Sequence, residues 1–508
     1  MKSSDTSLFM SERAPQVFLT VGVLLYLLAF PTEPLFFGNQ VTKFLFGMRW
    51  AGVGHLEHDW TANTRYGLPV FGSLIYAIYA SGMPWLTYVV QAGLIVLFAL
   101  AAHGIARAWR GATTWRELLH VDRYSLLFFA PFVVLSLGYP ARIWYGVAHQ
   151  TTIGPDFETA SFGILFFVSV LLYLAGRKTA AIALTIPTAL IHPGYILPGT
   201  ILIGGFVVAD WATRNQLPRR YWITIALALV SFVAHTVYLR LHFLPTSPAL
   251  SERANTIITE GRLPEITMVR VWVFSMGTLI KVPVVMLAIW LARKQPIGQI
   301  LGVGFLAVTA LTLAQAISGS HLFALIEPWR ASIWIAPIAL IVLIAWAADW
   351  FDRQILARTA GAWRTALLAG MFVLPAAGIS YGAYDKATSY PRHIKPYEEY
   401  LKRNATDQTQ ILAPLDLLAL RVNAEAPVYV SEKTHPYQDF EVLEWNRRMQ
   451  LAGAIYKPQA VDCGALQNLV RAAHLTHMVV LRPDQRVDCA FARTVYRDGD
   501  AKIYAFTL

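Results

Sequence analysis

The sequence predicts an α-helical protein that crosses a membrane about eleven times and ends in a small soluble α/β domain. Hydrophobic residues make up 56% of the chain and charged residues only 14%, whereas soluble domains average about 25% charged residues. The mean hydropathy is +0.46, and long apolar runs recur as far as residue 384. Such a chain cannot cover its surface with polar groups in water. A cytosolic enzyme, a disordered scaffold and a collagen-like fibre are therefore excluded.

Apolar runs long enough to cross about 30 Å of hydrocarbon define the expected spans. They lie near residues 15–36, 85–106, 125–140, 162–176, 179–195, 195–211, 221–239, 269–292, 297–318, 329–349 and 365–384. The apolar stretch at 68–82 is shorter, and its length suits a re-entrant or surface-lying helix better than a span.

Charges between the spans predict which side of the membrane each loop occupies. With the N-terminus in the cytoplasm, the inner segments hold sixteen lysines and arginines and the short outer segments hold nine. An excess of these residues marks the cytoplasmic side. We therefore expect a multi-pass protein of the bacterial inner (plasma) membrane whose tail is periplasmic or extracellular. The net charge of +11 is then explained by the cations on the cytoplasmic side of the membrane. No nucleic-acid partner is expected.

The composition changes at residue 385, which divides the chain into a membrane module, 1–384, and a tail, 385–508. The tail holds 16 of the 42 cations and 15 of the 31 acids, a balance typical of soluble domains. Its pattern shows a short apolar run at 410–413 and predicts strands at 427–430 and 477–481, helices at 441–455 and 466–473, and a hairpin over 494–506. Cys463 and Cys489 both fall in the tail. In an oxidising compartment we expect a disulfide, with two free thiols as the alternative.

The first outer loop, residues 31–84, carries Glu57 and Asp59 two residues apart. In an extended or turning backbone such residues project the same way. The pair could share a divalent cation, Mg²⁺ or Mn²⁺, through hard oxygen ligands. Alternatively, one carboxylate could take a proton from an attacking hydroxyl, or the motif could be an ordinary solvated loop.

The second outer loop, residues 139–161, repeats this spacing in Asp156 and Glu158, and it also carries Arg142 and His149, which are candidates for binding a substrate or its phosphate. The same two uses, metal binding and proton transfer, apply to this second pair.

Three further cations are candidates for binding a substrate. Arg330, at the mouth of the tenth span, could hold a phosphate in a planar fork, and His192, between the fifth and sixth spans, would offer a single donor. The alternative for Arg330 is an anchor at the level of the lipid headgroups. Lys281 lies halfway along the eighth span, where a cation costs at least about 2.5–3.5 kcal/mol. It should face the bundle interior or a watery cavity, either in a structural pair or in a substrate site.

These features together resemble the GT-C class of membrane glycosyltransferases. The shared features are a cytoplasmic N-terminus, a long first outer loop with an acidic motif, many spans and a soluble extracytoplasmic tail. Short segments are also similar to a poorly characterised family of bacterial polytopic proteins. They are Asn39-Gln40, Asp59-Trp60 and Pro69-Val70-Phe71 in the first loop, and residues 432–436 (Glu-Lys-Thr-His-Pro) and 444–448 (Glu-Trp-Asn-Arg-Arg) in the tail.

The resemblance implies transfer of a sugar from a polyprenyl-phosphate or polyprenyl-diphosphate carrier to an acceptor glycan, lipid or protein outside the cytoplasm. It implies a base or metal-ligand role for Asp59 and, with less support, Glu57. Asp156 and Glu158 match the second-loop acids of the metal-dependent branch. The resemblance also implies that Arg330 and His192 bind the carrier phosphate. The first acid here is Glu57 rather than aspartate, which leaves the metal requirement open.

Other classes of protein share part of this pattern. A transporter or flippase for lipid-linked saccharides should show inverted repeats and broken helices, and the sequence shows no internal repeat. An O-antigen-type ligase or polymerase usually carries its large loop late in the chain. A non-catalytic assembly protein would use the tail as a binding module. Convergence of Asp59, Arg330 and the second-loop acids on one site would favour the glycosyltransferase.

Overall fold

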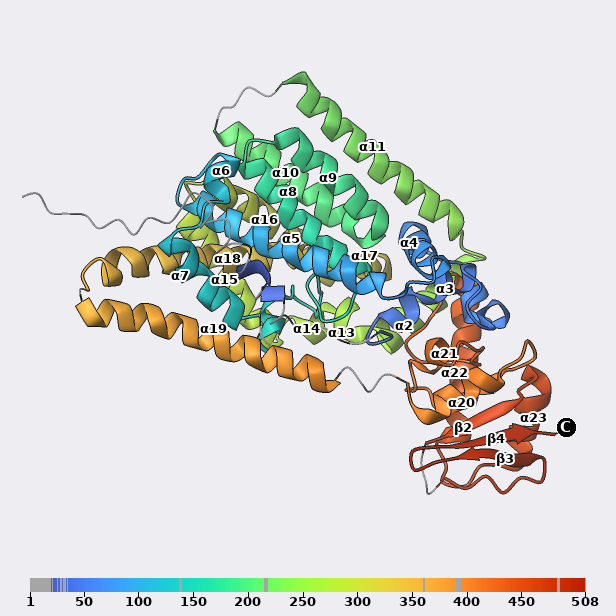
Figure 1. Cartoon of the computed structure of the whole chain (residues 1–508). Coiled ribbons are helices and arrows are strands. Elements are labelled where there is room, and N and C mark those ends of the chain that lie inside the picture. The colour runs from blue at the N-terminus through green and yellow to red at the C-terminus, as the bar shows by residue number, and fades with distance from the viewer. Residues whose placement is uncertain are drawn as a thin grey trace, which may run out of the picture.

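The computed structural model describes residues 20–507 apart from 21, 25, 28–29, 31–32, 34, 137–138, 214–217, 360, 390–393 and 482–484. A large helical bundle forms the first part of the molecule, and the tail packs at one end of it, beside α2, α3 and α4 (Figure 1). The segments of the first loop are α2 (Gln40–Lys43), α3 (Leu45–Trp50), η1 (Leu56–His58), η2 (Thr61–Asn63) and α4 (Pro69–Ala80).

The bundle contains both long and short helices. They are α5 (Leu86–Trp109), α6 (Trp115–Leu118), α7 (Arg123–Val134), η3 (Tyr139–Trp144), η4 (Thr159–Gly163), α8 (Ile164–Leu174), α9 (Lys178–Ile191), η5 (Pro193–Tyr195), α10 (Ile196–Ala212), α11 (Arg219–His242), α12 (Pro248–Thr256), η6 (Ile257–Arg262), α13 (Pro264–Thr267), α14 (Val269–Trp272), α15 (Met276–Ala292), α16 (Pro296–Ser318), α17 (His321–Ile326), η7 (Pro328–Ala331), α18 (Ser332–Phe351), η8 (Asp352–Leu356) and α19 (Gly361–Ser389).

Five helical segments among the described residues are long and apolar enough to cross a membrane, judged by length and composition. They are Leu86–Trp109, Pro193–Ala212, Arg219–His242, Pro296–Ser318 and Phe323–Leu356. The predicted spans from the second onward coincide with helices, but several of these helices have only 10–17 residues. The predicted span at 15–36 lies mostly outside the described residues. The count of about eleven spans is therefore not confirmed. The short helix expected at 68–82 is present as α4.

Burial differs strongly among the long helices. The apolar window of Phe323–Leu356, which contains α18, is 83% buried, whereas those of α11 and α16 are only 22% buried. Large apolar side chains such as Val230 and Ile317 point outward from α11 and α16, with exposed fractions of 65% and 85%. An apolar surface of this extent on two long helices suits a lipid environment.

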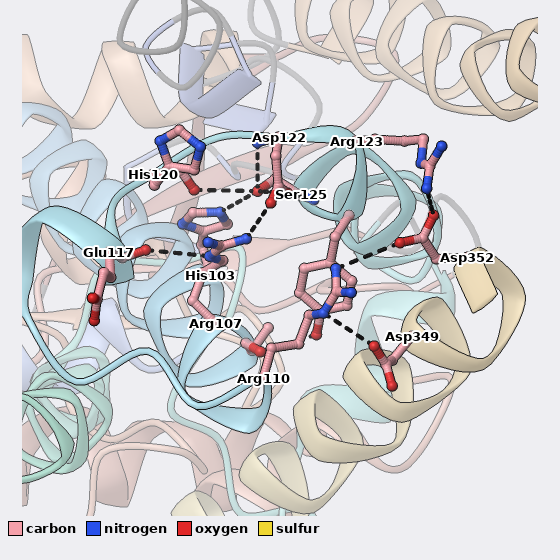
Figure 2. A network of polar contacts seen from close by, with 12 residues as sticks. His103, Arg107, Arg110, Glu117, His120, Asp122, Arg123, Ser125, Asp349 and Asp352 are labelled. Carbon is pink, nitrogen blue, oxygen red and sulfur yellow. Dashed lines mark hydrogen bonds and ion pairs between the residues drawn. The ribbon is translucent and has the colours of Figure 1, made fainter. Parts of the chain in front are cut away.

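A network of ion pairs joins α5, α7 and α18 at the bundle end far from the tail (Figures 1 and 2). Its members include arginines predicted to face the cytoplasm. The pairs are Arg107–Asp122 at 2.6 Å, Arg110–Asp349 at 3.0 Å and Arg123–Asp352 at 2.5 Å. Because these cations are matched by carboxylates on neighbouring helices, the network fixes the helix ends.

The tail is an α/β domain with a four-stranded sheet in the order β1-β2-β4-β3. The strands are β1 (Ile411–Leu412), β2 (His477–Val480), β3 (Ala492–Arg497) and β4 (Lys502–Phe506), and the helices are α20 (Pro396–Asn404), α21 (Leu420–Asn423), α22 (Asp439–Tyr456) and α23 (Cys463–Ala473). β1 is parallel to β2, and the other two pairs are antiparallel. The predicted hairpin, the strand at 477–481 and both predicted helices are confirmed.

Three details of the tail bear on the other expectations. The predicted strand at 427–430 is reduced to an isolated bridge between Val428 and Ile411. Cys463 and Cys489 form the expected disulfide. The boundary placed at residue 385 falls inside α19, which continues to Ser389, because a change in composition need not coincide with the end of a helix.

Candidate functional site

Asp59, the acid singled out in the first loop, is fully buried. It follows the short 3₁₀ turn of η1 in an extended conformation. Its Oδ2 accepts hydrogen bonds from Arg421 Nε at 2.7 Å and from the Val428 amide at 3.0 Å. Its Oδ1 accepts one from the Ala62 amide at 2.9 Å. Both oxygens are therefore engaged by the protein itself.

Arg421 on α21 completes this buried contact between the first loop and the tail. Its other nitrogens donate to Ser431 Oγ, Thr61 Oγ1 and the Val428 carbonyl at 3.1–3.2 Å. Each nitrogen of the Arg421 guanidinium thus donates to the protein, as in a structural ion pair. Asp59 thus holds the loop against the tail.

Glu57 does not join Asp59 in the structure. Its side chain is 66% exposed, whereas that of Asp59 is 0% exposed. The reason is the 3₁₀ turn at 56–58: with about three residues per turn, side chains two positions apart point in different directions. Because the backbone at 56–58 is not extended, the two carboxylates do not project the same way. The shared cation expected between Glu57 and Asp59 therefore has no geometric basis.

Asp156, in the second loop, is clamped by the first loop. The backbone amide of Asn39 donates to Asp156 Oδ2 at 3.2 Å, and the backbone amide of Glu33 donates to the Pro155 carbonyl at 2.8 Å. Gly38 adopts φ +57°, and a Cβ there would lie 2.5 Å from Asp156 Oδ2. Only glycine meets both requirements, so the approach of the two loops depends on this residue.

Glu158 is buried beside Asp156, with an exposed fraction of 6%. Burial and the nearby charge of Asp156 raise the pKa of the Glu158 carboxyl to about 7, against the lowering effect of Lys43 and Lys433. Burial also raises the pKa of Asp156. A carboxyl that titrates near neutral pH can accept a proton and release it again.

The surroundings of this acid pair do not suit a divalent cation. Lys43 comes from α2 and Lys433 from the tail, and both act on Glu158 through their charges. Two ammonium groups already balance two carboxylates. An added divalent ion would leave an excess of positive charge in a largely buried place, which is costly. We derive no chemical step through a metal at Asp156 and Glu158.

Arg330 and His192 lie in contact in the structure. Arg330 Nη1 lies 3.2 Å from His192 Nε2. Arg330 also donates to Glu327 Oε2, through Nε at 3.0 Å and through Nη2. Glu327 in turn accepts from Gln150 Nε2 at 2.8 Å. Glu327 has φ +50°, an unfavourable conformation for a residue with a side chain, and these contacts hold it there.

Donors face both ring nitrogens of His192. The Gly194 backbone amide donates to Nδ1 at 3.1 Å, and Arg330 Nη1, which can only donate, lies 3.2 Å from Nε2. Burial and the charge of Arg330 lower the pKa of His192 well below its ordinary value, which keeps the ring neutral. An anionic oxygen that displaced the contact of Arg330 with His192 would accept from Arg330 Nη1, and also from His192 in its Nε2–H tautomer.

One lysine links the acid pair to the two donors. The charge of Lys43 lowers the pKa of both Glu158 and His192. The carboxylates of the second loop and the donors at Arg330 and His192 therefore belong to one electrostatic network. We name this network the acid–donor site: Asp156, Glu158, Lys43, Lys433, His192, Glu327 and Arg330.

The remaining predicted substrate residues lie elsewhere. Arg142, on η3, and His149 are exposed. Lys281 Nζ donates to the Gly146 carbonyl at 3.0 Å. It borders an apolar cavity of about 210 Å³ between α14, α15, α16, η7 and α18, whose lining includes Trp272 and Trp329. Lys281 thus borders an apolar cavity rather than a watery one, and a backbone carbonyl holds its ammonium group.

Several residues in the acid–donor site, or in contact with it, were not singled out from the sequence as candidates. Gly38-Asn39 had a signal, since glycine followed by asparagine marks a turn. Lys433 lies in the tail segment 432–436, which supported the resemblance. Glu327, Gln150 and Lys43 had no sequence signal, because only the fold brings them to the loops.

Comparison with known proteins gives limited information. A family described as a domain of unknown function (DUF6798) matches residues 392–452 of the tail. No curated protein matches the chain. Among solved structures, the chain is similar to an archaeal oligosaccharyltransferase from Archaeoglobus fulgidus, determined in complex with an inhibitory peptide and a dolichol-phosphate. The identity is 10% and the TM-score 0.47, over 91% of this chain and 69% of that chain. A likeness this distant carries no functional argument.

Proposed function

We propose that this protein is a membrane glycosyltransferase of the GT-C type. In this proposal it moves a sugar from a polyprenyl-phosphate or polyprenyl-diphosphate carrier to an extracytoplasmic acceptor. The observation that carries the proposal is the contact of Arg330 Nη1 with His192 Nε2, two groups that could donate to a phosphate, in one network with the buried acids Asp156 and Glu158. Group transfer from a phosphate needs both parts: donors for the leaving group and a base for the acceptor.

The donor pair would stabilise the departing phosphate. Negative charge grows on the leaving oxygen as the bond from phosphate to sugar breaks. Donors fixed in advance in a poorly hydrated place stabilise that charge more than mobile water does. Glu327 holds the guanidinium of Arg330, and the Gly194 amide holds the ring of His192. The guanidinium is therefore held in place, and the phosphate would displace only its contact with His192.

Glu158 would act as the base on the acceptor hydroxyl. A base is most effective when its pKa lies near the working pH, and the pKa of Glu158 is raised to about 7. The proton of the hydroxyl passes to Glu158 as its oxygen attacks the sugar carbon, and the phosphate leaves with the bonding electrons. Asp156, fixed by Asn39, keeps Glu158 basic through its charge.

Two further surfaces would hold the ends of the substrates. The apolar cavity is lined by Trp329, the residue next to Arg330 in the chain. A lipid chain in this cavity would therefore place its phosphate toward the donors. In the tail, a cleft of about 460 Å³ is lined by Trp60, Arg447, Arg448 and Asn468, among others, and Arg448 lies 4.1 Å over the Trp60 ring. Aromatic and hydrogen-bonding side chains of this kind suit a saccharide acceptor.

The proposal is tested with purified protein in liposomes that contain a radiolabelled polyprenyl-phosphate sugar and an extract of envelope acceptors. We expect label to move from the lipid to the acceptor fraction. Glu158→Gln should abolish most of this transfer, and the exposed Glu57→Gln should not. Label that crosses the bilayer while still attached to its carrier would identify a transporter and contradict the proposal.

A further inference from the structure

Glu57 takes part in a second cluster of charged and ligating side chains, on the surface where the first loop meets the tail. His58 Nε2 lies 3.3 Å from Glu57 Oε1 and 3.8 Å from Asp407 Oδ1. His55 Nδ1 lies 2.8 Å from the same Asp407 oxygen. Glu57, His58 and Asp407 each offer one ligand atom, and these atoms lie within 4.8 Å of one another.

The spacing of these atoms suits tetrahedral coordination. Zinc binds imidazole nitrogen at about 2.0–2.1 Å and carboxylate oxygen at about 2.0–2.2 Å, so two ligands of a tetrahedral site stand about 3.3–3.5 Å apart. The distances of His58 Nε2 from Glu57 Oε1 and Asp407 Oδ1, 3.3 and 3.8 Å, are close to that value. Small rotations of these three exposed side chains would bring their ligand atoms to it, with water as the fourth ligand.

The composition of the cluster distinguishes zinc from magnesium. One imidazole and two carboxylates are ligands that zinc accepts readily, and His55 holds one of these carboxylates from outside the set. Magnesium prefers oxygen ligands in an octahedral arrangement and retains much of its water. This set differs from the acid pair at Asp156 and Glu158, which has no histidine and is flanked by lysines.

Backbone hydrogen bonds and turns fix the two segments that carry the ligands. The His55 amide donates to the Glu425 carbonyl at 2.8 Å, and Gly54, with φ +54°, allows the approach, since a Cβ there would lie 2.3 Å from that carbonyl oxygen. The Thr406 amide donates to Thr409 Oγ1 at 2.8 Å and closes the turn that carries Asp407. The ligands therefore need not be assembled from mobile chains.

We propose that Glu57, His58 and Asp407 bind one zinc ion that clips the first loop to the tail, and that His55 holds Asp407 in position for it. The ion lies at the surface, so it exchanges with the solvent. It reinforces the same junction as the buried pair of Asp59 and Arg421 and takes no part in sugar transfer.

The test uses the full-length protein in detergent, without a polyhistidine tag and after treatment with a chelator. Zinc chloride is titrated against a chromophoric competitor, and thermal melting is recorded with zinc or magnesium chloride. We expect one zinc per chain at micromolar concentration and a higher melting temperature with zinc but not with magnesium. His58→Ala and Asp407→Asn should each weaken binding at least tenfold and remove the thermal shift.

The matched controls are His149→Ala and Asp416→Asn, which remove an exposed histidine and an exposed aspartate outside the cluster; both should bind zinc as the parent does. Binding that survives in either ligand variant, a stoichiometry other than one, or no thermal shift with zinc would overturn the proposal. The assay measures metal and melting only, so its result does not depend on the proposed sugar transfer.

Discussion

Arg421 Nε lies 2.7 Å from Asp59 Oδ2, although the two residues are 362 positions apart in the chain. Neither side chain is more than 2% exposed. The contact joins the first loop of the membrane module to the tail, and it uses the very residue that the acidic motif predicted to be catalytic. Substitutions of these two residues therefore distinguish a structural role for Asp59 from a chemical one.

Asp59→Asn should destabilise the protein rather than impair transfer directly. The change keeps the size of the side chain but leaves the charge of Arg421 buried without a partner, which typically costs about 3–5 kcal/mol. Thermal melting in detergent should show a clear fall, and Arg421→Gln should show a similar one. The double variant should lose less than the sum of the two. Asp416→Asn, at an exposed position, should melt within about 0.5 kcal/mol of the parent.

A different result would restore the chemical role. If Asp59→Asn melts like the parent protein and reaches the membrane in equal amount, yet transfers no sugar, then its carboxylate acts on a substrate. The buried ion pair would then be incidental.

The helices and the tail strands were predictable because they follow from local patterns. Apolar runs gave the positions of the bundle helices, and alternation gave β2 and the hairpin of β3 and β4. The site was not predictable in the same way. Asn39 and Asp156 are 117 positions apart, and a single 3₁₀ turn at 56–58 sent Glu57 outward and Asp59 inward. Pairings of this kind come from tertiary packing, which a motif in one loop does not encode.

His192→Ala should weaken the use of the lipid carrier. It removes the ring that would donate from Nε2 to the phosphate in the proposal, and a hydrogen bond to a charged group is worth about 1.5–3 kcal/mol. We expect kcat/KM for the polyprenyl-phosphate sugar to fall roughly tenfold to a hundredfold. His149→Ala, which removes an exposed histidine of the same predicted set, should leave it unchanged. Equal loss in both variants would speak against a phosphate at the donor pair.

The rate of transfer should depend on pH through Glu158. As a base, this carboxyl must be ionised, and its pKa is raised to about 7. The rate should therefore rise about tenfold per pH unit well below pH 7 and level off above it. Glu158→Gln should retain only a low rate without this rise, measured at saturating carrier from pH 5 to 9. A parent rate that is flat between pH 5 and 7 would remove Glu158 from the base role.

The same carboxyl affects stability in the opposite direction. Its folded pKa lies above the unfolded value of 4.5, so between about pH 4.5 and 7 the folded state binds more protons than the unfolded state. The contribution of protonated Glu158 to the free energy of unfolding is complete below this window and is lost as the pH rises through it. Melting curves should show this loss in the parent protein and not in Glu158→Gln.

Reduction of the bond between Cys463 and Cys489 should destabilise the tail. The bond closes a loop across a sequence separation of 26, and removal of such a cross-link typically costs about 2–5 kcal/mol. Alkylation of unreduced, denatured protein should label neither thiol, and the double serine variant should melt earlier than the parent. Labelling of both thiols in freshly purified protein would show that the bond does not form in the cell.

Gly38→Ala gives the sharpest test of how the acid–donor site is built. Gly38 adopts φ +57°, and a Cβ there would stand 2.5 Å from Asp156 Oδ2, so the added methyl must push the carboxylate away from the Asn39 amide. Gly52→Ala is the matched control, since Gly52 has φ +70° with nothing within 4 Å of its added Cβ. Both variants carry the backbone strain of a left-handed alanine, about 1–2 kcal/mol, and both should melt slightly earlier. Only Gly38→Ala should also lose sugar transfer, by tenfold or more at equal membrane levels, because only there does the methyl displace the residue that keeps Glu158 basic. If the two variants transfer sugar equally well, Asp156 does not need its contact with the first loop, and the acid pair is not the centre of the reaction.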